Sequence, residues 1–149
     1  MATKALKQNR PSINRLGKTA YRDLATFRFE LRRFLIFSDA AAASAGVTNR
    51  QYQALLAIKA QPTEVLTMKQ MAHELSLAQH GAVQLVNRLE AQNLAQRSRS
   101  PTDGRSVLVS LTAEGERLVR ELASAHLAEL IIHEPLLVRS LRRLRKLSA

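Results

Sequence analysis

The chain has 149 residues, with 23 Lys and Arg against 12 Asp and Glu, a net charge of +11, and no cysteine. This length fits one domain, or one domain with a dimerisation element. The lack of cysteine excludes disulfides, thiolate metal ligands and a thiol switch, so peroxide is not expected to act through cysteine chemistry. The charge favours an anionic partner, which charge alone leaves open between nucleic acid, an anionic membrane and an acidic protein.

Aliphatic residues must form most of the core, because hydrophobic residues make up 46% of the chain and aromatic residues only 4%. This composition favours helices. The apolar runs are too short to span a bilayer, and the polar, basic start of the chain lacks the apolar stretch of a signal peptide. We therefore expect a cytoplasmic protein with no membrane partner.

The N-terminal third is predicted to hold one long helix. Residues 1–18 show no sustained apolar period and are expected to form a flexible basic arm. From about residue 21 to 45, apolar residues recur at helical spacing, and Gly46 suits the helix end.

Three shorter helices are predicted in the middle of the chain, over residues 49–60, 68–75 and 78–92. Thr48 and Thr67 can cap the first two of them, and the Ser76-Leu77 pair separates the second from the third. The helix over 78–92 is predicted to bury its apolar face, which comprises Ala82, Leu85, Val86 and Leu89. Its polar side chains are expected to remain accessible.

Two short strands, 94–98 and 106–111, are predicted next, and the Pro, Asp and Gly residues between them are typical of a turn. They would form a hairpin with Arg105 at its tip. Thr112 can cap a further helix. Pro135 is expected to break or kink that helix before a final amphipathic stretch.

This order of elements predicts a winged helix-turn-helix, whose second helix enters the major groove with polar side chains near its N-terminus. Gln79 could bond an adenine edge, His80 could donate or accept, and Gly81 would allow close approach of the backbone. Arg105 would enter the minor groove, where the negative potential attracts a guanidinium.

The residues predicted to bind DNA are Thr67, Lys69, Gln79, His80, Gly81, Gln84, Arg88, Arg97, Arg99, Asp103, Gly104 and Arg105. Some of them have a plainer interpretation. Capping alone explains Thr67, Arg88 is equally consistent with a structural ion pair, and Arg97 and Arg99 are equally consistent with ordinary exposed strand residues.

Four segments in order resemble the MarR family of bacterial regulators: MAHEL at 71–75, VQLVNRLE at 83–90, DGRS at 103–106 and LTAEG at 111–115. The resemblance implies a mainly α fold with a small β-hairpin wing, in which a winged helix-turn-helix lobe joins a helical dimerisation region formed by the N- and C-terminal helices. The domains would be the flexible basic arm (1–18), the N-terminal dimerisation helix (19–46), the DNA-binding lobe (47–112) and the C-terminal dimerisation helices (113–149).

The resemblance further implies a homodimer that represses, or less often activates, transcription at a pseudo-palindromic operator on double-stranded DNA. It also implies release by a small aromatic or phenolic ligand. It makes Arg105 the minor-groove arginine, with Asp103 as its partner. The chain departs from the family at Ala78, where members often carry a Ser that caps the recognition helix. This departure concerns which bases are read.

The sequence also bears on functions other than transcription regulation. The alternative is an architectural DNA-binding protein with little sequence preference, which the high charge and the basic arm favour. No phosphate-binding Gly loop, nucleophile motif or cluster of catalytic acids indicates an enzyme, and no cofactor is expected. His126 and His133 lack further ligands for a metal site, so no metal is expected. The last amphipathic stretch could lie on a membrane, but packing on a second subunit is favoured.

Overall fold

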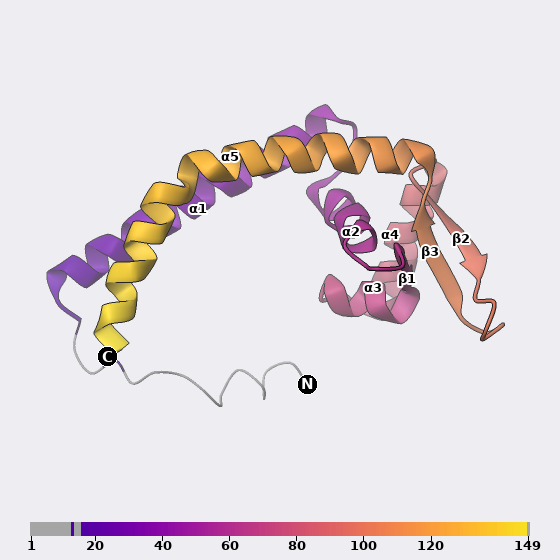
Figure 1. Cartoon of the computed structure of the whole chain (residues 1–149), viewed down its shortest axis with the longest axis horizontal. Coiled ribbons are helices and arrows are strands. Elements are labelled where there is room, and N and C mark those ends of the chain that lie inside the picture. The colour runs from indigo at the N-terminus through magenta and orange to yellow at the C-terminus, as the bar shows by residue number, and fades with distance from the viewer. Residues whose placement is uncertain (1–12, 14–15, 149) are drawn as a thin grey trace. The chain divides into compact units, whose positions relative to one another are not determined.

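The computed structural model describes residue 13 and residues 16–148, so most of the predicted basic arm lies outside the described residues. The elements, in chain order, are α1 (Lys18–Ser44), α2 (Asn49–Lys59), β1 (Val65–Thr67), α3 (Met68–Glu74), α4 (Gln79–Ala91), β2 (Ala95–Arg99), β3 (Val107–Leu111), α5 (Ala113–Arg145) and the 3-10 turn η2 (Lys146–Ser148) (Figure 1). The predicted fold class, mainly α with a small β wing, is confirmed. None of the described helices is apolar enough over a sufficient length to cross a membrane.

The sheet has one strand more than the predicted hairpin. β3 pairs antiparallel with β2, as expected, and its other edge pairs antiparallel with β1, so that Leu66 and Arg97 both lie opposite Val109. The two-strand prediction was therefore incomplete. β1 has only three residues, which is too short to display the alternation by which a strand is recognised in a sequence.

Of the two outcomes expected at Pro135, the break is absent, and the kink stays a prediction. α5 continues through this residue to Arg145, although proline removes one helical hydrogen bond to the carbonyl four residues earlier. That carbonyl belongs to Ile131, and both Ile131 and Pro135 are exposed. Water can therefore satisfy the freed carbonyl, which makes the proline tolerable at this point of the helix.

The chain divides into two compact units. The winged-helix unit comprises residues 37–128, and the helical unit comprises the described residues up to Ile36 together with residues 129–148. In the winged-helix unit, α4 buries the four residues predicted to face inward, Ala82, Leu85, Val86 and Leu89. They join a core that α2, α3, β3 and the start of α5 complete. Burying one face of α4 leaves its polar face in solvent.

A close backbone contact joins the end of the α4 segment to the start of α5. The Thr112 N–H donates to the Leu94 carbonyl at 3.2 Å, and the Thr112 hydroxyl donates to the Asn93 carbonyl at 2.6 Å while accepting from the Gly115 N–H at 3.0 Å. A Cβ on Gly115 would lie 1.9 Å from the Leu94 carbonyl oxygen. Only glycine therefore allows this approach, which explains the Leu-Thr-x-x-Gly spacing of residues 111–115.

Gly115→Ala is expected to lower the free energy of unfolding by about 2 kcal/mol or more, because the clashing atoms are backbone and cannot rotate away. Urea unfolding at fixed protein concentration measures this change. Gly104→Ala is the matched control, since a Cβ at Gly104 meets nothing within 4 Å. Equal stability of the two variants would contradict the proposed constraint.

Two histidines of α5 are buried in different units. In the winged-helix unit, His126 stacks on Tyr52 with ring centroids 4.4 Å apart, and its Nε2 lies 2.7 Å from the Ser38 hydroxyl. Neither His126 nor His133 belongs to a group that could hold a metal ion among the residues that the structure describes.

In the helical unit, His133 of α5 lies between two carboxylates. Its Nδ1 is 2.7 Å from Glu30 of α1 and its Nε2 is 3.0 Å from Glu129 of α5, and only 1% of its side chain is exposed. A carboxylate offers no proton, so both ring nitrogens must carry one to satisfy both contacts. The hydrogen bond to Glu30, aided by that to Glu129, raises the pKa of His133 above its ordinary value of 6.5 against the opposing effect of burial.

The raised pKa gives a signed pH dependence. The stabilisation by His133 is fully present below pH 6.5, the ordinary value, and is lost as the pH rises through the higher pKa in the folded chain. We therefore expect the urea midpoint to fall with rising pH above this value, and to fall less steeply in His133→Gln. Parallel pH curves for wild type and variant would show that this ion cluster does not contribute.

Candidate nucleic-acid interface

The exposed face of α4 carries most of the predicted base-reading residues. Gln79, His80, Gln84 and Arg88 are exposed, and Gly81 is half-buried. The N-cap residue Ala78 has extended backbone and makes no side-chain capping bond, and Ser76, which adopts a positive φ of 52°, does not replace it. The first turn of α4 therefore has no side-chain cap, so its polar groups can interact with a partner.

The start of α3 is held by a capping box. Gln70 N–H donates to the Thr67 hydroxyl at 3.2 Å, and Thr67 N–H donates to the Gln70 side chain at 2.8 Å. Thr67 therefore caps α3, which is the structural one of the two roles considered for it. Lys69, in the first turn of the same helix, is exposed and has no acidic partner among the described residues.

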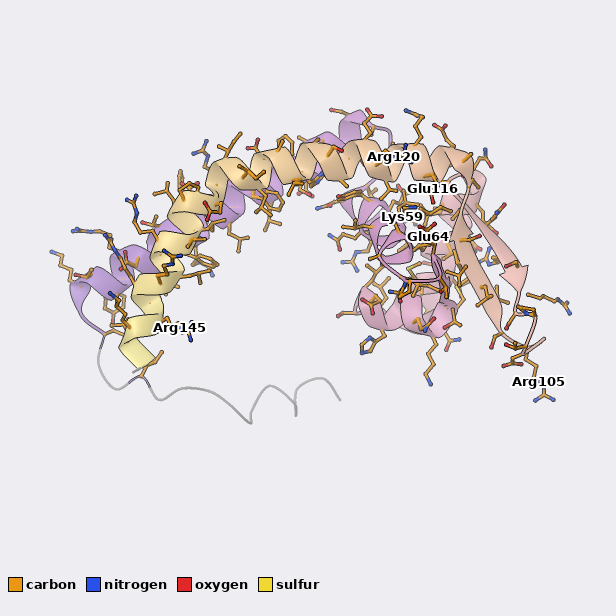
Figure 2. All side chains as sticks on the ribbon, viewed as in Figure 1. Lys59, Glu64, Arg105, Glu116, Arg120 and Arg145 are labelled. Atoms are coloured by element: carbon orange, nitrogen blue, oxygen red, sulfur yellow. The ribbon has the colours of Figure 1, made fainter. Side chains whose placement is uncertain are left out.

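The wing tip is shaped by Asp103. Its carboxylate accepts hydrogen bonds from the backbone N–H of Arg105 at 3.1 Å and from the Ser106 hydroxyl at 2.9 Å. The resemblance made Asp103 the partner of Arg105, and the structure shows that the contact is to the backbone. The side chain of Arg105 extends from the end of the wing into solvent (Figure 2). Asp103 and Gly104 therefore position the arginine without neutralising it.

Arg97 and Arg99 of β2 differ in their surroundings. The guanidinium of Arg97 pairs with Glu90 and donates to the Asn87 side chain at 2.7 Å, while the Arg97 N–H donates to Glu90 at 2.9 Å. These contacts hold β2 against the last turns of α4. Arg99 is exposed and has no such partner in the described part of the chain. No sequence motif indicates the Arg97–Glu90 pair, because it joins residues brought together only by the turn after α4.

The acidic side chains of the winged-helix unit neutralise other cations. Lys59 pairs with Glu64 at 2.7 Å and with Glu116 at 2.9 Å, three residues that Figure 2 shows close together beside α5. Arg117 pairs with Glu114 at 2.6 Å and with Glu121 at 3.1 Å. Arg88 of α4 and Arg105 at the wing tip are among the described cations of this unit that no acidic side chain neutralises, which suits an anionic ligand.

Sequence reasoning missed one cation beside this face. Arg50, in the first turn of α2, is exposed and lines a groove together with Arg88 of α4. No DNA-binding motif includes this residue, so only the packing of α2 against α4 could reveal it.

Residues 45–106, which include α4, β2 and the wing turn, match the model described as the MarR family. This segment of the chain is similar to the MarR family. A curated relative, the "Organic hydroperoxide resistance transcriptional regulator" of Bacillus subtilis (strain 168), is 42% identical over 72 residues. That alignment covers 48% of this chain and 48% of the relative, so the chain matches about half the length of this curated relative.

Solved structures show the same MarR fold over a longer stretch. AbsC, a MarR family transcriptional regulator from Streptomyces coelicolor, is 21% identical with a TM-score of 0.67, and the match covers 80% of this chain and 81% of AbsC. CouR from Rhodococcus jostii RHA1, bound to p-coumaroyl-CoA, is 28% identical with a TM-score of 0.60, covering 66% of this chain and 68% of CouR. The resemblance read from the sequence motifs is confirmed.

Proposed function

We propose that this chain is a transcription regulator that binds double-stranded DNA sequence-specifically as a homodimer. The observation that carries the proposal is the exposed polar face of α4, whose apolar face is buried in the core of the winged-helix unit, beside a wing whose tip arginine has no ion pair among the described residues. The name of the curated relative, a transcriptional regulator, supports it. Repression is the mode that the family resemblance favours.

The exposed side chains suit distinct roles in such a complex. Gln79, His80 and Gln84 are proposed to read base edges in the major groove, and Gly81 to let the backbone approach. Arg105 is proposed to enter the minor groove. The remaining predicted residues either contact phosphates or hold the interface in shape; they are Thr67, Lys69, Arg88, Arg97, Arg99, Asp103 and Gly104.

The homodimer is proposed from apolar side chains that the single chain leaves in solvent. In the helical unit these are Tyr21, Leu24, Phe29, Leu31, Leu35 and Ile36 of α1, and Leu130, Ile131, Ile132, Leu136 and Leu141 of α5. Monomeric proteins rarely expose so much apolar surface on neighbouring turns. A second copy would cover it, and a two-fold dimer would read two half-sites about one DNA turn apart.

A small aromatic ligand is proposed to release the dimer from DNA. The solved structure of CouR, which holds p-coumaroyl-CoA at 28% identity to this chain, supports this class of effector. Because the chain contains no cysteine, a peroxide signal would have to act by chemistry other than thiol oxidation.

Arg105→Ala is expected to weaken binding to duplex DNA by several-fold or more without changing the thermal unfolding midpoint, because the side chain is exposed and has no hydrogen bond or ion pair with the described residues. Fluorescence anisotropy on the tightest-binding duplex measures the affinity. Arg120→Ala is the control, since it removes the same charge from an exposed position on α5 (Figure 2). Equal affinities for the two variants would argue against a wing contact.

Ile132→Asp is expected to shift the protein from dimer to monomer, because the side chain is 68% exposed in the single chain and a dimer would bury a charge there. Light scattering coupled to size exclusion measures the mass. Leu56→Asp places the same charge at a 41% exposed position of the winged-helix unit and should leave the dimer intact. A dimeric Ile132→Asp would place the interface elsewhere.

A further inference from the structure

A groove of about 490 Å³ lies between the first turn of α2 and one side of α4. Its walls are Thr48, Arg50, Leu77, Gly81, Gln84, Leu85 and Arg88. All seven residues belong to the winged-helix unit, so the groove is a feature within one compact body. It opens beside the same face of α4 that carries the proposed base contacts.

The groove has two guanidinium groups and no acidic residue in its lining. Neither Arg50 nor Arg88 has a hydrogen bond or ion pair from its side chain among the described residues. By contrast, Lys59, Arg97 and Arg117 of the same unit are each paired with glutamates. Two unpaired guanidinium groups from different helices favour an anion, and their planar forks match the oxygens of a phosphate.

The groove is continuous with the proposed DNA face, because Gln84 and Arg88 belong to both. Gly81 adds no side chain to its floor, where a Cβ would meet only Leu77 at 3.8 Å. When a helix lies in the major groove, the sugar-phosphate backbone passes along its sides. A duplex docked on α4 would therefore bring phosphates to this groove.

We propose that Arg50 and Arg88 hold a backbone phosphate of each DNA half-site in this groove. The inference rests on the proposed function and extends it to a residue of α2 that no motif includes. Arg50 fixes the position of α4 in the major groove and does not distinguish bases. Its contribution is therefore the same for every sequence, and it decreases with salt as counterions compete.

Arg50→Gln tests the proposal on the full-length protein. Each lost phosphate contact reduces the slope of log affinity against log salt by about 0.9, so a dimer that loses two should show a slope less steep by about 2. We expect several-fold weaker binding at low salt, with the affinity ratio between the preferred duplex and a mutated one unchanged. Circular dichroism and the unfolding midpoint check that the variant is folded.

Arg120→Gln is the matched control, because it removes the same charge from an exposed site outside the groove. The proposal is overturned if Arg50→Gln keeps the wild-type salt slope, behaves like Arg120→Gln, or changes base preference. A duplex carrying one neutral methylphosphonate per half-site, scanned along the backbone, provides a second measurement. At the contacted position, Arg50→Gln should cause no further loss; additive losses at every position would also overturn the proposal.

Failure of the groove and failure of the proposed function are distinguishable. If wild type shows no preference among duplex sequences, the regulator assignment fails. If wild type shows a preference that Arg105→Ala weakens and Arg50→Gln does not, only the phosphate site of the groove is wrong.

Discussion

The winged-helix unit depends on the contact between the Leu94 carbonyl and the first turn of α5. The Thr112 N–H reaches this carbonyl at 3.2 Å, and Gly115 leaves room for it because it has no Cβ. The contact fixes four chain segments at one point: the end of α4, the start of β2, the end of β3 and the start of α5. α4 and the wing are thereby held in one body, which the Arg97–Glu90 pair reinforces between β2 and α4.

Charged residues are distributed unevenly between the two units, so the net charge of the whole chain does not describe the proposed DNA face. The winged-helix unit holds nine Lys and Arg against eight Asp and Glu, whereas the described helical unit holds ten against four. The proposed DNA face therefore attracts an anion through Lys69, Arg88, Arg99 and Arg105, which have no acidic partner among the described residues, and less through the net charge of the unit. Specificity then rests on the polar face of α4, while the excess charge adds attraction that salt weakens.

Much of this fold follows from local sequence signals. The two threonine caps, the buried face of α4 and the turn of the wing depend on residues within a few positions of one another, so periodicity and turn chemistry predict them. The missed features depend on contacts between distant segments. One is β1, which forms because it can pair with the free edge of β3. The others are the burial of His133 between two glutamates and the groove that Arg50 and Arg88 line together. The helix through Pro135 persists because the position is exposed.

The proposed dimer reads a defined DNA sequence through α4 and the wing. The most direct measurement is selection of bound sites from a random duplex library at physiological salt, followed by sequencing. We expect enrichment of an inverted repeat whose half-sites are about one helical turn apart. Binding without enrichment of any sequence would contradict it and would identify an architectural DNA-binding protein, in which the winged helix contacts only phosphates.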